Sequence, residues 1–434
     1  MNPRVVRLLF WKALFIGLLG VLSSHADGQT KAISLADAAS HAVELSQLTL
    51  QGSPPFHLKA TVVETTNPDS GYRAEIEEYW VSPEKWRRTI SSPKFSQVLL
   101  QSGSEQFAQD TGDYYPLWLR KLVTAIFEPV PMLAQLKRID AHLQSENYQG
   151  EMCAEFQTKV GEQPAQSSAY HVFCFDARRR LLNSIVTPSY SAFFEDYQPF
   201  EKKLVARRIT NGPEPGTTLL VTVTELSVLP NPDEKLFAKD QLAPTQPIRT
   251  LQIDQLVADT LALNTPAIQW PTVRSGKTSG VLSIYISADK SGRVREAWPL
   301  NSDNAGLDDS VRDQVKNWRF KTVAVEGVPV QLETVLTFAF DTKVVNPLPW
   351  LTNEEARALA INTVEAECLA TGTTVTISVS VDESGKIIGI GNPNDLDNER
   401  FMAAFAALDQ WHFRPYVKDG KVDRFTADIT FVGK

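Results

Sequence analysis

The stretch Leu282-Ser-Ile-Tyr-Ile-Ser-Ala-Asp-Lys-Ser-Gly292 alternates apolar and polar side chains and then turns at Asp-Lys-Ser-Gly. A pattern of helical spacing follows it and ends at Trp318-Arg-Phe320, and a second alternating run covers Gln331 to Phe340. Alternation with a period of two is typical of half-buried strands, and Gly-containing polar steps are typical of turns. The stretch therefore predicts a small sheet with one helix packed on it.

The same pattern returns near the carboxyl terminus. It reads Val375-Thr-Ile-Ser-Val-Ser380, Asp382-Glu-Ser-Gly385, Trp411-His-Phe413 and Arg424 to Phe431. The displacement is constant, because 382 − 289 and 411 − 318 both give 93. Chance alternation does not keep a turn glycine, a tryptophan and a final phenylalanine in step, so we expect two copies of one module.

The first copy resembles the carboxy-terminal domain of TonB-type energy transducers. The resemblance rests on the alternating strand, the Asp-x-x-Gly turn, Trp318-Arg-Phe320, Glu326-Gly-Val-Pro-Val330 and Thr337-Phe-Ala-Phe340. The second copy departs from it, because Lys418-Asp-Gly-Lys421 replaces the Gly-x-Pro-Val element. In that family the domain receives an extended segment of an outer-membrane receptor by strand addition at a sheet edge.

The resemblance implies that the last strand of each copy is a partner-binding edge for a segment of an envelope or outer-membrane protein. The alternative is that one copy covers the edge of the other. The candidate edge positions are Glu333, Val335, Thr337, Ala339, Thr426, Asp428 and Thr430.

Residues 30–242 read as many consecutive strands with a helical interruption over 116–145. The segment Tyr79-Trp-Val-Ser-Pro-Glu-Lys-Trp86-Arg-Arg88 within them is similar to outer-membrane lipoprotein carriers of the LolA type. The resemblance implies an open curved sheet, capped by helices, whose apolar inner face shelters acyl chains. Ordinary core packing is the alternative use of the side chains that would line this groove, which are Phe56, Leu58, Val62 and Trp86.

The expected fold class is α+β, with an amino-terminal curved antiparallel sheet and helices followed by two small strand-strand-helix-strand TonB-like modules. We place a signal peptide over 1–26 and the LolA-like domain over 27–242, then a connector with a helix over 243–280. The first module takes 281–345, and a connector helix with the second module takes 346–434. The connector helix begins at Thr352-Asn-Glu-Glu355, which has the capping-box pattern.

The amino-terminal segment has the features of a secretory signal. Arg4, Arg7 and Lys12 precede or interrupt the largely apolar run Leu8 to Leu22, and Ser24-His-Ala26 supplies small residues for cleavage after Ala26. The alternative is a retained inner-membrane anchor. Cleavage removes three positive charges and no negative ones, so the formal charge of −8 becomes −11. We expect a periplasmic protein that does not bind nucleic acid.

Two of the three cysteines sit in alternating runs on either side of a turn-rich segment. Cys153 and Cys174 can therefore face each other across a hairpin, and export favours a persistent disulfide. Two reduced core cysteines are the alternative. Cys368 is left over, as a small apolar residue.

No pattern for catalysis, metal or cofactor binding emerges. Gly276-Lys-Thr278 lacks the earlier glycine of a phosphate loop, because Pro271 occupies that position. Adjacent acidic residues such as Glu77-Glu78 point apart on a strand, so we interpret them as solvated faces. The expected function is a periplasmic, non-enzymatic binding or adaptor protein that engages an extended protein segment. The alternative is a carrier of lipid or lipoprotein acyl chains through the amino-terminal domain.

Overall fold

A computed structural model of the chain describes residues 33–130, 133–144, 150–158, 169–187, 190–212, 217–239, 242, 247–366, 369–391 and 398–433. The expected signal peptide and Cys368 lie outside the described residues. The described chain forms two compact units. The first contains the residues up to Trp270 and Ser279–Asp341, and the second contains Pro271–Thr278 and the residues from Thr342 onward. The first module thus belongs to the same unit as the amino-terminal sheet.

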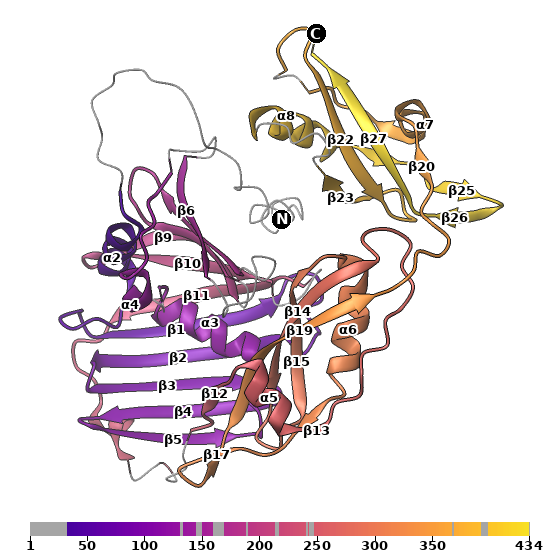
Figure 1. Cartoon of the computed structure of the whole chain (residues 1–434). Coiled ribbons are helices and arrows are strands. Elements are labelled where there is room, and N and C mark those ends of the chain that lie inside the picture. The colour runs from indigo at the N-terminus through magenta and orange to yellow at the C-terminus, as the bar shows by residue number, and fades with distance from the viewer. Residues whose placement is uncertain are drawn as a thin grey trace. The chain divides into compact units, whose positions relative to one another are not determined.

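One eleven-stranded antiparallel sheet dominates the first unit, in the order β5-β4-β3-β2-β1-β11-β10-β9-β8-β7-β6 (Figure 1). Two meanders join where β1 pairs with β11, so the outermost strands are β5 and β6. The strands of this sheet are β1 (Phe56–Glu64), β2 (Arg73–Ser82), β3 (Lys85–Ser92), β4 (Phe95–Ser102), β5 (Glu105–Thr111), β6 (Glu151–Thr158), β7 (Ala169–Asp176), β8 (Leu182–Thr187), β9 (Tyr190–Phe200), β10 (Lys203–Asn211) and β11 (Leu219–Val228).

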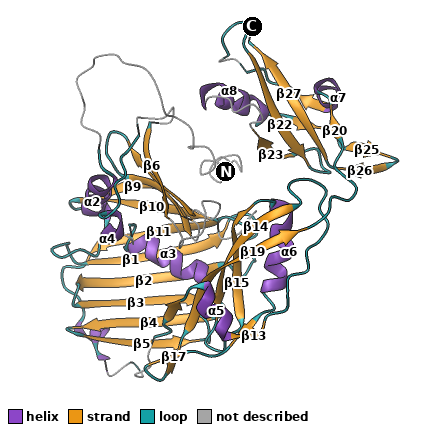
Figure 2. Ribbon diagram, viewed as in Figure 1, coloured by secondary structure: helices purple, strands orange, loops and turns teal. Residues whose placement is uncertain are grey.

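Within the described residues, three α-helices pack on one face of this sheet, which we call the inner face. They are α2 (Leu35–Ser46), α3 (Leu117–Phe127) and α4 (Leu133–Leu136). Ten inter-strand spacings of about 4.8 Å make a sheet about 48 Å wide, whereas each helix is about 10 Å across. Figure 2 shows the sheet curving around these helices. A 3₁₀ turn, Glu234–Phe237, covers a smaller apolar cluster around Leu100.

The first module is a four-stranded sheet in the order β12-β19-β14-β15. Two-stranded ribbons form beside it from β13 with β16 and from β17 with β18. Its elements are β12 (Thr250–Gln252), α5 (Gln255–Leu261), β13 (Ala262–Asn264), β14 (Ser279–Ala288), β15 (Val294–Ser302), a 3₁₀ turn (Ala305–Leu307), α6 (Asp308–Val315), β16 (Arg319–Phe320), β17 (Ala324–Val325), β18 (Val328–Pro329) and β19 (Gln331–Asp341).

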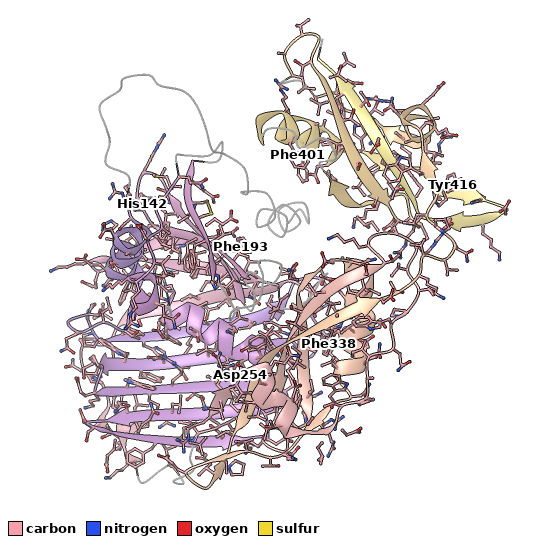
Figure 3. All side chains as sticks on the ribbon, viewed as in Figure 1. His142, Phe193, Asp254, Phe338, Phe401 and Tyr416 are labelled. Carbon is pink, nitrogen blue, oxygen red and sulfur yellow. A yellow bond between two sulfur atoms is a disulfide. The ribbon has the colours of Figure 1, made fainter. Side chains whose placement is uncertain are left out.

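The second module repeats this order as β20-β27-β22-β23, so the duplication expected from the sequence is confirmed. Figure 3 labels Phe338 of the first module, whose half-buried ring lies 5.6 Å from that of Trp318, and Phe401, which belongs to the core of the second. The elements are β20 (Trp350–Leu351), α7 (Asn353–Leu359), β21 (Ala360–Asn362), β22 (Thr374–Val381), β23 (Ile387–Gly391), α8 (Asn398–Leu408), β24 (His412–Phe413), β25 (Tyr416–Lys418), β26 (Lys421–Asp423) and β27 (Phe425–Val432).

The turn glycines of the repeat have a steric reason. Gly292 and Gly385 both have positive φ, and a Cβ added to either would lie 2.0 or 1.9 Å from the carbonyl oxygen of Phe320 or Phe413. Only glycine fits a chain that combines this conformation with such an approach. The residue three positions earlier, Asp289 or Asp382, accepts backbone and hydroxyl hydrogen bonds across the same turn.

The α+β assignment is wrong. Of the described residues 48% lie in strands and 18% in helices, and one large antiparallel sheet sets the architecture. The strand-strand-helix-strand layout is also incomplete, because the connectors supply β12 and β20, which pair in parallel with β19 and β27. Strands of three and two residues are too short to show a period of two in the sequence. The connector helix at Thr352 is confirmed, with its full capping box.

Candidate functional site

The inner face of the large sheet brings together the four side chains predicted to line an apolar groove. Phe56 on β1 lies opposite Trp80 on β2, which lies opposite Trp86 on β3. Phe56, Leu58 and Val62 are fully buried, and Trp86 is half-buried against the same core. Phe56 also stacks on Trp80 with ring centres 5.4 Å apart. In this structure these side chains form the core beneath the helices.

A buried ion pair interrupts this apolar face. Glu78 on β2 lies opposite Leu58 on one side and opposite Arg88 on β3 on the other, and the guanidinium donates to its carboxylate. The side chain of Glu78 is 0% exposed. Burial raises the pKa of Glu78, and the charge and hydrogen bond of Arg88 oppose that rise. The second oxygen, Oε1, has no hydrogen-bond partner among the described residues.

The ion pair also contacts the covering helix. The guanidinium carbon of Arg88 lies 3.8 Å from the ring centre of Phe127, the last residue of α3, and 5.3 Å from that of Trp86. Such cation–π contacts are strongest where water is excluded. Our interpretation of Glu77-Glu78 as a solvated face is therefore wrong for Glu78. Its inward position in an alternating strand, opposite an inward arginine, was the signal available in the sequence.

A second buried polar cluster joins α3 to the first module, and we call it the α3 junction. From β15, Glu296 Oε1 accepts the Leu117 amide at 2.6 Å and the Tyr114 hydroxyl at 2.9 Å. From β19, Gln331 accepts the Tyr115 amide at 2.6 Å and donates to the Tyr115 carbonyl at 3.2 Å.

The α3 junction also contains an ion pair between Arg120 on α3 and Glu333 on β19. Glu333 is 0% exposed and accepts the Tyr285 hydroxyl at 2.5 Å and the Ser287 hydroxyl at 3.3 Å. Burial, opposed by hydrogen bonds from Leu117, Tyr114 and Trp118, raises the pKa of Glu296 to about 7. Burial, and then the neighbouring charge of Arg120, lower the pKa of the Lys121 ammonium to about 8. Sequence reasoning missed this cluster, since its members lie far apart in the chain.

The seven candidate edge positions lie on β19 and β27, and their backbone groups point away from the neighbouring strands β14 and β22. Several of these backbone groups already have hydrogen-bond partners within the chain. The Glu333 carbonyl accepts from Ile253, and the Gln255 side chain bonds both backbone groups of Thr337. In the second module the Thr426 amide donates to the Pro349 carbonyl.

Thr430 repeats the pattern of Thr337. Its amide donates to Asn353, and its carbonyl accepts from Arg357 at 2.7 Å. Gln255 and Asn353 are each the first residue of a helix, α5 or α7. The last strands are therefore not the outermost strands of their sheets, because the connectors occupy part of the edge on which strand addition was expected. Val335, Ala339 and Asp428 lie on the same side of these strands.

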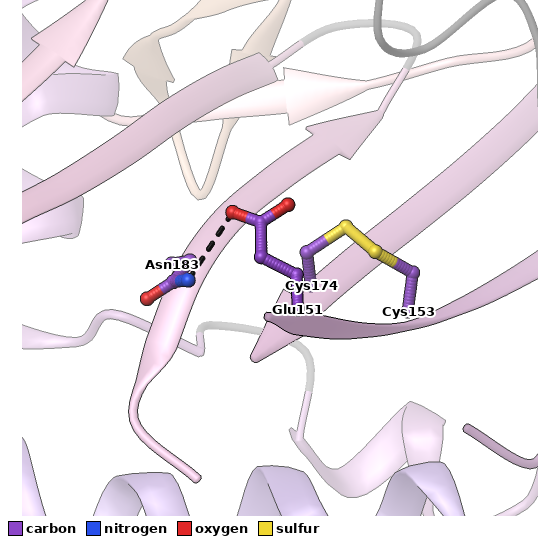
Figure 4. The surroundings of a disulfide bond; sticks show 4 residues. All are labelled: Glu151, Cys153, Cys174 and Asn183. Atoms are coloured by element: carbon purple, nitrogen blue, oxygen red, sulfur yellow. Dashed lines mark hydrogen bonds between the residues drawn. A yellow bond between two sulfur atoms is a disulfide. The ribbon is translucent and has the colours of Figure 1, made fainter. Parts of the chain in front are cut away.

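The predicted disulfide is present. Cys153 and Cys174 lie directly opposite each other on β6 and β7, with Cα atoms 4.1 Å apart and the sulfurs bonded (Figure 4). Glu151 lies close to both sulfurs and accepts from Asn183 at 3.2 Å. This group has ligand atoms at metal-binding distances, but bonded sulfurs are not thiolate ligands, so it offers no metal site.

No family model matches the chain, and no curated protein matches it. Solved structures similar to it include a LolA superfamily protein from Nitrosomonas europaea, with 13% identity, a TM-score of 0.30 and coverage of 49% of this chain and 100% of that one. A putative outer membrane lipoprotein-sorting protein domain from Vibrio parahaemolyticus gives 9% identity, a TM-score of 0.30 and coverage of 48% and 97%. A DUF1329 family protein from Desulfovibrio piger gives 11% identity, a TM-score of 0.33 and coverage of 49% and 100%.

TM-scores this low establish neither fold nor function, so we base the function on the geometry of the molecule itself. Among the described residues, no helix has both the length and the apolar character needed to cross a membrane.

Proposed function

We propose that the protein is a non-enzymatic periplasmic carrier that shelters an acyl chain of a lipid or lipoprotein against the inner face of the eleven-stranded sheet. The observation that carries the proposal is the apolar inner face itself, which among the described residues is covered mainly by short, separate helices, with Trp298 of the first module at its margin. The polar exceptions are the Glu78–Arg88 pair, Glu64 and Asn211 opposite Leu219, and a few groups near β5; the other side chains offer only non-directional dispersion contacts. An acyl chain suits such a surface, because it has no polar group to satisfy.

The burial of α3 on the sheet and the burial of an acyl chain in its place can be compared as free energies. Eight of the eleven residues of α3 are buried, and each large apolar side chain contributes about 1.5–3 kcal/mol on burial. A chain of about fifteen methylenes gains about 12 kcal/mol on leaving water, at about 0.8 kcal/mol for each. The apolar burial that an acyl chain gains on the sheet is therefore of the same order as the apolar burial that α3 loses when it leaves.

The compartment belongs to the proposal. The amino-terminal segment reads as an export signal, and a disulfide persists in an oxidising compartment. We do not propose strand addition at β19 or β27, because Ile253, Gln255, Pro349 and Asn353 already bond those strands.

Native mass spectrometry of the full chain exported to the periplasm tests the proposal. We expect adducts with the mass of a lipid or acylated peptide, and the same adducts after incubation with a triacylated peptide. Leu99, opposite Arg88 on the inner face, and Val98, on the outer face, are both half-buried on β4. Leu99→Asp should reduce the adduct and Val98→Asp should leave it. Absence of any adduct from wild-type protein, or equal loss in both variants, would overturn the proposal.

A further inference from the structure

Helix α3 has no cap of its own at its amino terminus. The N-cap residue is Pro116, whose side chain accepts no hydrogen bond. The first amides of a helix need acceptors from elsewhere, and a buried end without them is unstable. Glu296 of the first module supplies the acceptor for Leu117. A strand that lies 179 residues further along the chain thus caps the helix that covers the inner face.

The first module also holds the side of α3 and the turn before it. Arg120 pairs with the fully buried Glu333, which the hydroxyls of Tyr285 and Ser287 hold in place. The two hydrogen bonds between the Gln331 amide and the Tyr115 backbone fix the segment that leads into α3. Glu333 and Gln331 are fully buried and Arg120 is half-buried, so separation of α3 from the module would leave polar atoms without partners unless water entered.

By contrast, the opposite end of α3 is held by the amino-terminal domain. The Thr49 hydroxyl donates to the Phe127 carbonyl at 3.0 Å, and Arg88 lies over the Phe127 ring. The helix is therefore fixed at one end by the large sheet and at the other by the module.

We propose that the first module is a latch: through Glu296, Gln331 and Glu333 it holds α3 over the inner face, and the helix leaves the sheet only when the α3 junction opens. The inference rests on the proposed function, because the displacement of α3 matters only if the inner face receives a ligand. It assigns the module a role inside its own chain, as a device that controls access to the carrier surface. An event that displaces β15 and β19 would free the amino-terminal end of α3, and the contacts of Phe127 would then hold the helix at its other end.

Hydrogen–deuterium exchange of the full chain, followed by mass spectrometry, tests the latch directly. Glu333→Gln and Arg120→Met should each raise exchange in peptides covering 117–127 by about tenfold or more, while α2 stays protected. The double variant should exchange no faster than the faster single variant, since both remove one interaction. Glu326→Gln is the matched control, because this carboxylate in the same module pairs with Arg249 at 3.1 Å but its side chain is 78% exposed.

If Glu333→Gln does not fold, Tyr285→Phe removes one hydrogen bond to the same carboxylate and should give a smaller rise in the same peptides. Faster exchange confined to β14 and β19, with α3 unchanged, would overturn the latch. Native mass spectrometry of the same variants separates the two proposals. If α3 exchanges faster in the variants but wild-type protein never binds an acylated peptide, the latch proposal stands and the carrier proposal fails.

Discussion

The guanidinium carbon of Arg88, on β3 of the large sheet, lies 3.8 Å from the ring centre of Phe127, at the end of α3. The same guanidinium neutralises Glu78, whose carboxylate is fully buried among apolar side chains. One arginine thus compensates a buried charge and provides a contact for the covering helix.

Removal of Arg88 should therefore destabilise the protein strongly. Arg88→Met leaves the Glu78 carboxylate buried and unpaired, and the loss of a buried partner typically costs about 3–5 kcal/mol. Urea unfolding of the full chain measures the loss. The double variant Arg88→Met, Glu78→Met should recover most of the stability, because no charge remains buried. A double variant as unstable as Arg88→Met alone would contradict this account.

The turn glycines give a second prediction, with a control in the same module. Gly292→Ala forces a Cβ against the Phe320 carbonyl oxygen, whereas Gly327 has a similar φ of +80 with nothing near the position of a Cβ. Gly327→Ala should lower the unfolding free energy by about 1 kcal/mol, because alanine is less stable than glycine in a left-handed backbone conformation. Gly292→Ala should cost clearly more, and equal losses in the two variants would refute the steric explanation.

Glu296 should make the stability depend on pH. Its folded-state pKa of about 7 lies above the ordinary value of 4.5, so the folded protein binds this proton more tightly than the unfolded chain. The contribution of Glu296 to the unfolding free energy is therefore fully present below pH 4.5 and is lost as pH rises towards 7.

Glu296→Gln removes the titration, so the difference in stability between the variant and wild type should shift in favour of the variant with rising pH. The shift should reach roughly 3 kcal/mol at most, from the difference in pKa. Denaturant unfolding between pH 4.5 and 8 measures it, with Glu326→Gln as the exposed control. If the stability difference between Glu296→Gln and wild type stays constant across this range, the pKa of Glu296 is not raised in the folded protein.

The disulfide should stabilise the first unit. The bond between Cys153 and Cys174 closes a loop of 21 residues, and loops of this size typically contribute about 3 kcal/mol. The double variant Cys153→Ser, Cys174→Ser should lower the unfolding free energy by about this amount, and a reductant should have the same effect on wild type. A reductant that destabilises the double variant equally would rule the bond out as the cause.

Much of the organisation was predictable, because it rests on local patterns. The period of two along β1, β2, β14 and β22 placed strands and the inner-face residues Phe56 and Leu58, and the opposed runs placed Cys153 against Cys174. The duplication of the module was predictable because the turn glycine and the tryptophan of the two copies are separated by the same number of residues. These signals are local and depend on side-chain alternation or on backbone sterics.

The remaining features depend on contacts between distant segments. Glu296 and Leu117 are 179 residues apart, and Arg120 and Glu333 are 213 apart, so no spacing in the sequence connects them. The short strands β12 and β20 are defined by their pairing with β19 and β27 and have no period of their own. The fold class was misjudged for the same reason, since the count of strands depends on such pairings.

Photoaffinity labelling of the full chain with an acyl probe that carries a terminal diazirine tests the carrier function most directly. The probe should label peptides of β1 to β4 at inward residues such as Leu58, Trp86 and Leu99, and unlabelled triacylated peptide should compete. Labelling of the outer-face cluster around Leu100 and Phe237, or of the second module, would contradict the account. So would the absence of competition.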